Sequence, residues 1–379
     1  MSDEVLERMI SSYMRTEQPT YAFGWQGGEP ILMGADFFRK VVDLQSRHGK
    51  AGASVSNGLQ TNATLIDDEL AAHLEKYHFL LGVSIDGPPE FHNTYRLTAS
   101  GKATHDAVLK GIDALNRHNV EYNGLILVSA ANVDHPEQVY RYLRNLGIYF
   151  HQYIPCVEFD DEGNALPYSI TGEQWGTFLS TIFDLWIKND TRKISIRTFD
   201  AILGQMVDGR YTMCTQSGNC TSYFVVEYNG DVYPCDFFVE KSKIIGNIVR
   251  DEWETFQNSK KYRAFGIQKA GWSQVCGNCR FLRYCSGDCP KQRYVENRNP
   301  ENLSWLCAGW KRFYNHTLSD FERLAVTLLN ERQYSLPEKE RRIYSGVQNY
   351  RIGWNDTCYC GSGKKYRLCH GTAVSSRSI

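Results

Sequence analysis

Eight cysteines between Cys214 and Cys307 follow the spacing C-x5-C-x14-C-x40-C-x2-C-x5-C-x3-C-x17-C. An iron–sulfur cluster of the 4Fe–4S type takes four thiolates, so eight cysteines suffice for two clusters without remainder. In a reducing compartment, a C-x2-C pair with further cysteines close by is typical of metal ligation rather than of disulfide bonds. The array therefore predicts two iron–sulfur clusters. Its members are Cys214, Cys220, Cys235, Cys276, Cys279, Cys285, Cys289 and Cys307.

The composition argues against several other classes of protein. The 379 residues carry a formal net charge of -1, so nothing indicates an electrostatic surface for nucleic acid or anionic lipid. No run of eighteen apolar residues occurs and no apolar segment follows a basic start, so we expect neither a membrane span nor a secretory signal. We therefore expect a cytoplasmic protein that binds neither nucleic acid nor membrane.

Short β-rich segments alternate with amphipathic helical segments up to about residue 190. Strands separated by helices of this length favour a parallel sheet with right-handed crossovers, either a barrel or a doubly wound sheet. The predicted strands cover residues 21–25, 53–56, 79–85, 122–128 and 148–154, and the predicted helices lie near 35–48, 67–77, 103–118 and 135–146.

Polar motifs stand at the ends of three of these strands, where βα sheets carry their functional groups. In WQGGEP (25–30), two glycines permit close backbone approach and the Glu29 carboxylate can accept hydrogen bonds from an ammonium group. QTN (60–62) and SIDG (84–87) add polar groups on the same rim, and Arg96 is able to bind a carboxylate. Each of these motifs taken alone is also compatible with an ordinary turn or an exposed loop residue.

With WQGGEP, QTN, SIDGPPEFHNTYR and the cysteine array in this order, the chain resembles radical S-adenosylmethionine (SAM) enzymes that carry a twin-cluster domain of the SPASM type. More narrowly, it resembles the anaerobic sulfatase-maturating enzymes from residue 1 to about 325, most specifically in the cysteine spacing with YPCD (233–236). Enzymes of that family oxidise the active-site Cys or Ser of a sulfatase to Cα-formylglycine without oxygen. They cleave SAM reductively at a first 4Fe–4S cluster, which releases a 5'-deoxyadenosyl radical. The resemblance implies a sulfatase polypeptide as substrate and a reductant such as flavodoxin or ferredoxin.

The resemblance also implies which residues bind SAM. Gly28 and Glu29 would meet its amino group, Ser84 and Arg96 its ribose and carboxylate, and Val157 would line the adenine pocket.

Asp236 directly follows Cys235, and the family places its general base at this position. Such a base takes the proton that the substrate side chain loses on oxidation. Without the resemblance, Asp236 would be interpreted as a turn carboxylate. Cys156 matches no ligand position of the family, and we expect it to be a small buried hydrophobic residue.

The family pattern divides the eight cysteines in an interleaved way. The first auxiliary cluster would take Cys214, Cys220, Cys235 and Cys289, and the second Cys276, Cys279, Cys285 and Cys307. Spacing alone also allows a sequential split into the first four and the last four. The interleaved division would join a hairpin in 214–235, whose turn is predicted at Asn229-Gly230, to the segment 276–307.

Two features of the N-terminal part depart from the family. Radical SAM enzymes hold their SAM-cleaving cluster on a C-x3-C-x2-C loop after the first barrel strand, and the first cysteine of this sequence is Cys156. Residues 1–10 predict a helix with an acidic start and no strand before it. We expect both features to reflect upstream residues missing from the sequence, through a miscalled start or a fragmentary record, and a third cluster to be bound there. The alternative is a natural truncation, which is disfavoured because a parallel barrel without its first strand would expose unpaired sheet edges. As written, the chain should hold two auxiliary clusters without cleaving SAM.

The C-terminal tail contains CYCGSGKKYRLCH (358–370), which resembles the SEC-C zinc motif. Three thiolates and an imidazole make a common tetrahedral set for structural Zn2+. So short a motif cannot bury a core, and the metal would supply its folding energy. The predicted ligands are Cys358, Cys360, Cys369 and His370.

The expected fold class is α/β: a partial (β/α)6 radical-SAM barrel lacking its first strand, followed by a small α+β SPASM domain and a zinc-knuckle tail. The predicted boundaries are 1–190 for the barrel, 191–325 for the SPASM domain, 326–354 for a linker or helical segment and 355–373 for the zinc motif. Two alternative functions stay open: a SPASM radical SAM enzyme that modifies another peptide, and a non-catalytic iron–sulfur or zinc protein.

Overall fold

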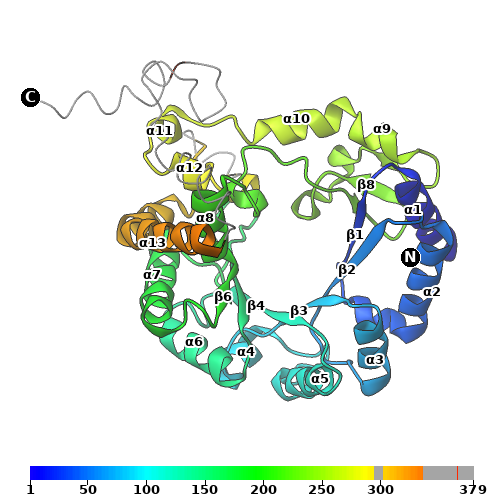
Figure 1. Ribbon diagram of the computed structural model, residues 1–379, viewed down its shortest axis with the longest axis horizontal. Helices are drawn as coiled ribbons and strands as arrows, with labels where there is room; N and C mark the ends of the chain where they lie inside the picture. Colours follow the sequence, from blue (N-terminus) through cyan, green and yellow to red (C-terminus); the bar gives the residue numbers. More distant parts are fainter. Residues whose placement is uncertain (294–301, 336–364, 366–379) are drawn as a thin grey trace, which may run out of the picture. The chain divides into compact units, whose positions relative to one another are not determined.

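The computed structural model describes residues 1–293, 302–335 and 365 of the chain. Its first region is built on a six-stranded parallel sheet whose strands are hydrogen-bonded in the order of the sequence (Figure 1). The strands are β1 (Thr20–Trp25), β2 (Ser54–Thr61), β3 (Leu80–Ser84), β4 (Tyr122–Val128), β5 (Phe150–Pro155) and β6 (Ser195–Ile196). This arrangement confirms the predicted parallel α/β fold.

Helices connect successive strands, and α2, α3, α5, α6 and α7 lie along the outer side of the curved sheet (Figure 1). The four helices predicted between strands correspond to α2, α3, α5 and α6. The helices of this region are α1 (Asp3–Arg15), α2 (Gly34–His48), α3 (Asp68–Lys76), α4 (Pro89–Tyr95), α5 (His105–Arg117), α6 (Pro136–Asn145), α7 (Gly172–Asn189) and α8 (Arg197–Asp208), with the 3-10 turn η1 (Pro30–Met33) after β1.

Helix α1 begins with a capping serine and acidic residues and carries apolar residues on its buried side. The Ser2 side chain accepts a hydrogen bond from the Val5 amide, and two acidic residues occupy the first turn, where they favour the positive end of the helix dipole. Its apolar residues are buried, and the helix packs against α2. The structure therefore confirms the helix predicted at residues 1–10, which extends to Arg15.

The sheet has two chemically different faces at its first strands. Tyr21, Phe23 and Trp25 alternate with exposed small residues along β1, so the large side chains lie on the helix side. On that side, Asn57 of β2 accepts a hydrogen bond from the Trp25 indole at 2.9 Å and exchanges hydrogen bonds with Gln45 of α2. The β1 residues that point to the opposite face, Thr20, Ala22 and Gly24, are exposed.

The second region carries the eight cysteines and a small antiparallel sheet in the order β7-β8-β9. A hairpin joins β7 to β8, and its turn at Asn229-Gly230 closes with a hydrogen bond from the Gly230 amide to the Glu227 carbonyl oxygen. Gly230 has a φ of +88°, a conformation that favours glycine. The predicted hairpin is confirmed. The elements of this region are η2 (Cys214–Gln216), β7 (Val225–Val226), β8 (Asp231–Tyr233), η3 (Asp236–Phe238), η4 (Lys241–Lys243), β9 (Gly246–Asn247), α9 (Trp253–Gln257), α10 (Lys260–Gln268), α11 (Gln274–Gly277), α12 (Leu282–Cys285), η5 (Pro290–Gln292) and α13 (Cys307–Ser335).

Several contacts attach the second region to the first, among them one at α1 and one at α7. Glu252 accepts hydrogen bonds from Arg8 and Arg15 of α1 at 2.5 and 2.7 Å. At the start of α13, Gly309 packs so closely on α7 that a Cβ at Gly176 would lie 2.7 Å from the Gly309 Cα. Cysteine-bearing segments are thus held against the barrel at separate points.

The chain divides into two compact units, residues 1–321 and 322–379, and both sheets and all eight cysteines of the array lie in the first. Within the described ranges, no helix is long and apolar enough to cross a membrane. The predicted zinc ligands Cys358, Cys360, Cys369 and His370 lie outside the described residues.

Candidate active site and cluster cavities

Four of the eight cysteines line one cavity, with a volume of about 480 Å³. We name it the proximal cavity because one of its cysteines, Cys235, directly precedes Asp236. Tyr223 and Lys269 also belong to its wall. The cysteines come from η2, from the loop after it, from the end of the hairpin and from the residue before η5: Cys214, Cys220, Cys235 and Cys289.

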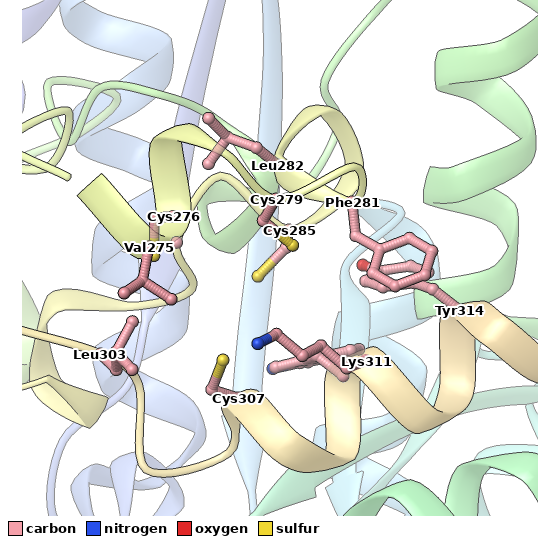
Figure 2. Close-up of a pocket in the computed structure, with 12 residues that line it drawn as sticks. Val275, Cys276, Cys279, Phe281, Leu282, Cys285, Leu303, Cys307, Lys311 and Tyr314 are labelled. Carbon is pink, nitrogen blue, oxygen red and sulfur yellow. The ribbon is translucent and has the colours of Figure 1, made fainter. Parts of the chain in front are cut away.

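The other four cysteines line a second cavity of about 350 Å³, the distal cavity. Figure 2 shows the sulfurs of Cys279, Cys285 and Cys307 directed toward a common space, with the amine of Lys311 pointing into the same space. The remaining wall is largely apolar and aromatic. The four cysteines come from α11, the residue that follows Asn278, the end of α12 and the start of α13: Cys276, Cys279, Cys285 and Cys307.

The loop between Cys285 and Cys289 sends two neighbouring cysteines into different cavities. Ser286, Gly287 and Asp288 have φ values of +45°, +69° and +64°, which reverse the chain within three residues. The buried Arg293 guanidinium stabilises this reversal by donating hydrogen bonds to the carbonyl oxygens of all three. The tertiary structure therefore groups the cysteines in the interleaved way, although spacing alone also permits the sequential division.

The thiols stand apart around each cavity, an arrangement that suits a cluster better than a single ion. Among the described residues, no three Cys, His, Asp or Glu side chains lie close enough to hold one metal ion. Burial raises the pKa of both Cys235 and Cys289 to about 12, so these thiols stay protonated without a metal. Iron deprotonates a thiol that coordinates it. The four-thiol walls thus fit 4Fe–4S clusters in donor type and number.

Asp236 lies where the two regions of the chain meet. Its carboxylate accepts a hydrogen bond from the Tyr223 hydroxyl at 2.7 Å and one from the Gln26 amide at 3.1 Å. Burial raises the pKa of Tyr223 well above its ordinary value, so this hydroxyl remains a proton donor. Asp236 itself is exposed. Neither Gln26 nor Tyr223 is predicted as a site residue from the sequence, although Gln26 lies within WQGGEP.

The WQGGEP and QTN motifs meet at the Glu29 carboxylate. Glu29 accepts hydrogen bonds from the Thr61 hydroxyl at 2.6 Å and from the Asn62 amide at 2.7 Å. Gly27 and Gly28 have φ values of +97° and +57°, and a Cβ at either position would meet no atom within 4 Å. These two glycines are exposed, so their backbone is accessible to a ligand beside Glu29.

Arg96 pairs with Asp86, a contact that the sequence does not reveal. Arg96 Nε and one terminal nitrogen lie 2.5 and 3.1 Å from the two oxygens of the buried Asp86 carboxylate. The Leu127 amide donates to the same carboxylate at 2.9 Å. Burial lowers the pKa of the adjacent His92 to about 3, so its neutral ring accepts a hydrogen bond from the Asp86 amide at 3.3 Å. Arg96 thus reaches the rim already oriented by a fixed partner.

The remaining predicted SAM contacts are buried near the ends of their strands. Ser84, the last residue of β3, is 8% exposed, and Val157, two residues after β5, is 2% exposed. Cys156 is 7% exposed and lies outside the walls of both cavities, which confirms the expectation of a buried small residue.

Comparisons with known proteins agree with this arrangement. Residues 1–143 match the radical SAM superfamily, residues 214–280 match the SPASM iron-sulfur cluster-binding domain, and residues 355–372 match the SEC-C motif. The parallel sheet and the two cysteine-lined cavities therefore belong to a radical SAM protein with a SPASM domain. These domains imply iron–sulfur clusters and SAM as cofactors, and the SEC-C motif implies zinc.

Relatives define the family more narrowly. The serine-type anaerobic sulfatase-maturating enzyme of Bacteroides thetaiotaomicron is 34% identical over 87% of this chain and 84% of its own length. The cysteine-type enzyme of Clostridium perfringens is 33% identical over 83% of this chain and 86% of its own length. The solved structure of native anSMEcpe with bound AdoMet and Kp18Cys peptide superposes with a TM-score of 0.82 at 32% identity, covering 86% of this chain and 91% of that chain. This chain belongs to the anaerobic sulfatase-maturating enzyme family, which confirms the resemblance found in the sequence.

Proposed function

We propose that this protein oxidises the active-site Cys or Ser of a sulfatase polypeptide to Cα-formylglycine by radical SAM chemistry. The observation that carries the proposal is the position of Asp236. Its carboxylate is exposed, is held by Gln26 of the barrel rim and by Tyr223, and directly follows Cys235 of the proximal cavity. A proton acceptor thus lies between the region that would bind SAM and the region that would bind a cluster.

The reaction requires three groups to leave the substrate residue. A hydrogen atom leaves its Cβ for the 5'-deoxyadenosyl radical, the resulting carbon radical loses one electron, and the side-chain thiol or hydroxyl loses one proton. Ser thereby becomes the aldehyde, whereas Cys becomes a thioaldehyde that water hydrolyses to the aldehyde with release of hydrogen sulfide. Asp236 takes the proton, since a positioned carboxylate within hydrogen-bond reach acts as a general base. A 4Fe–4S cluster bound in the proximal cavity supplies a one-electron acceptor next to this base.

We assign the auxiliary cluster ligands by cavity. Cys214, Cys220, Cys235 and Cys289 would hold one cluster, and Cys276, Cys279, Cys285 and Cys307 the other. The grouping of each set around one cavity supports this division over the sequential one.

We assign SAM binding to the barrel rim. Glu29 Oε1 accepts hydrogen bonds from Thr61 and the Ile31 amide, whereas Oε2 accepts only one, from the Asn62 amide. Oε2 therefore keeps a lone pair that can accept the SAM ammonium next to the open backbone of Gly28. Arg96 is oriented by Asp86 toward a carboxylate or ribose, with Ser84 and Val157 completing the site.

Three further assignments rest on the family and the sequence. A reductant such as flavodoxin or ferredoxin supplies electrons, and the protein acts in the cytoplasm. Cys358, Cys360, Cys369 and His370 bind zinc. The SAM-cleaving cluster needs a C-x3-C-x2-C loop, which the printed sequence does not contain.

The test uses protein that includes such a loop, reconstituted with iron and sulfide under anaerobic conditions. It is incubated with SAM, a reductant and a sulfatase peptide containing C/S-x-P-x-R, and mass spectrometry follows the Cys or Ser. We expect oxidation at that residue and none in a matched peptide with Ala in its place. SAM cleavage to 5'-deoxyadenosine without any change in the peptide would contradict the sulfatase assignment.

A further inference from the structure

A lysine is buried in the wall of the proximal cavity. Lys269 follows α10 directly, is 1% exposed and lines the cavity together with the four cysteines. Its ammonium donates a hydrogen bond to the carbonyl oxygen of Cys214. The Arg293 guanidinium donates to the Lys269 carbonyl oxygen at 2.8 Å, which fixes the backbone of this residue as well.

No carboxylate pairs with this ammonium among the described residues. Asp288 is a carboxylate that acts on this ammonium electrostatically, and its oxygens already accept hydrogen bonds from Ser304, Trp310 and the Cys289 amide at 2.7 to 2.8 Å. An ammonium group withdrawn from water is costly unless an anion compensates it. A 4Fe–4S core with four thiolate ligands carries a net negative charge. The proximal cavity therefore offers Lys269 its counter-charge only when a cluster is bound.

The distal cavity has a lysine of a different kind. Lys311 is an exposed residue of α13, and Figure 2 shows its amine directed into the space between the sulfurs. Water and dissolved salt screen an exposed charge far more than a buried one. The two cavities thus differ in how strongly a cation acts on what they hold.

We propose that Lys269 is the counter-charge of the proximal cluster and raises its reduction potential above the value that the four thiolates alone would give. A nearby positive charge stabilises the more negative, reduced state of a cluster, and net charge and hydrogen bonding are known to set such potentials. In the proposed function, on which this part rests, the substrate carbon radical gives up one electron, the oxidised proximal cluster gains it and Asp236 receives the proton. Lys269 acts as a positioning residue that favours this transfer.

The experiment measures potentials without substrate. The chain as printed, anaerobically reconstituted, is titrated with reductant and followed by electron paramagnetic resonance, which should show two cluster transitions. The proximal transition is the one absent from the double variant Cys214→Ala/Cys289→Ala. We expect Lys269→Met to move this transition to a lower potential and Lys269→Arg, which keeps the charge, to leave it near the wild-type value. A Lys269→Met protein with full iron content and both transitions unchanged would overturn the proposal.

Lys311→Met is the matched control, and we expect it to move only the distal transition, by less at high salt than at low salt. Should Lys269→Met lose its proximal iron, the unmodified protein decides the question at two ionic strengths. A buried counter-charge requires the proximal transition to respond less to salt than the distal one, and an equal response would refute it.

The outcomes separate this inference from the proposed function. A shifted proximal potential without formylglycine in the wild-type peptide assay defeats the function and leaves the role of Lys269 intact. Formylglycine formation by the wild-type protein, together with an unshifted proximal potential in Lys269→Met, would support the proposed function and refute the role of Lys269.

Discussion

The proximal and distal cavities hold equal numbers of cysteines, but different parts of the chain surround them. The proximal wall combines a hairpin end and loops with the hydroxyl of Tyr223 and the buried ammonium of Lys269, and it adjoins the exposed Asp236. Two distal cysteines come from the short helices α11 and α12 and a third from the start of α13, and the wall there is mainly apolar, with Val275, Phe281 and others. Asp236 and the Tyr223 hydroxyl that donates to it adjoin the proximal wall, whereas the distal wall includes the amine of Lys311 and the hydroxyl of Tyr314. This difference favours the proposal that the substrate reacts beside the proximal cavity.

The largest expected effect comes from breaking the division of the cysteines. Cys214→Ala/Cys289→Ala removes two ligands of the proximal set and should leave about four irons per chain, whereas Cys214→Ala/Cys276→Ala removes one from each set and should leave far fewer. Iron and sulfide analysis after anaerobic reconstitution measures both. Under the sequential division, Cys214 and Cys276 would share a cluster, so the second variant would be the one to keep four irons.

Asp236→Asn should remove catalysis and leave both cavities intact. A positioned general base typically contributes about 10² to 10⁴ in rate, and we expect formylglycine formation to fall by that factor. The rate of peptide oxidation and the iron content are measured together. Asp184→Asn, at an exposed carboxylate of α7 that pairs with His316, serves as control and should keep the wild-type rate. A wild-type rate in Asp236→Asn would show that another group takes the proton.

Gly309→Ala should affect the distal cavity first. A Cβ at Gly309 would collide with the carbonyl oxygen of Gly172, so α13 must move away from α7 and carry Cys307 with it. Overpacking of this kind costs about 1–3 kcal/mol of unfolding free energy. Chemical denaturation measures the loss of stability. In the reductive titration followed by electron paramagnetic resonance, the signal of the distal cluster should decrease more than that of the proximal cluster.

The control for this change is Gly204→Ala in α8. A Cβ there meets nothing within 4 Å, and alanine is the better helix former, so stability should hold or rise slightly. Equal destabilisation by the two substitutions would remove the packing explanation.

Tyr223→Phe should have the smallest effect. It removes the hydroxyl that donates to Asp236 at 2.7 Å but keeps the ring in the proximal wall. A hydrogen bond to a charged group contributes about 1.5–3 kcal/mol, so we expect turnover to fall by about 10- to 150-fold. The distal counterpart is Tyr314→Phe, which removes a 3.2 Å hydrogen bond to the Tyr284 carbonyl oxygen and should change turnover much less. Similar losses in both variants would contradict the functional difference between the cavities.

Local patterns predict the strands β1 to β5 and the helices α1, α2, α3, α5 and α6, but they give no prediction for α4, α7, α8 or the helices of the second region. The bounds of β2 also differ from the prediction. The sequence predicts a strand at 53–56, whereas β2 runs from Ser54 to Thr61. Asn57 and Gly58 have low strand propensity, but parallel pairing with β1 and β3 and the hydrogen bonds of Asn57 extend the strand through them. The short strand β6 was also not predicted, since two residues carry too little pattern.

The site was predicted in its parts rather than in its connections. Glu29 and Thr61 lie far apart in the sequence, as do Gln26 and Asp236, and each pair meets through a side-chain hydrogen bond. Periodicity describes neighbours along the chain, so it contains no information about such contacts. The sequence also does not predict the Asp86–Arg96 ion pair, because Asp86-Gly87-Pro88 has the composition of an ordinary turn.

Residue types and their spacing predict the number and type of the cluster ligands, the alternation of strands and helices that forms a parallel sheet, and the family. Ligand number and periodicity are properties of residue type and spacing, so they can be recognised without a fold. The fold places Cys285 and Cys289 at different cavities, brings Gln26 to Asp236 and buries Lys269 beside four thiols. These placements depend on a chain reversal with positive φ values and on packing between distant segments, and neither is fixed by the spacing of residues along the chain.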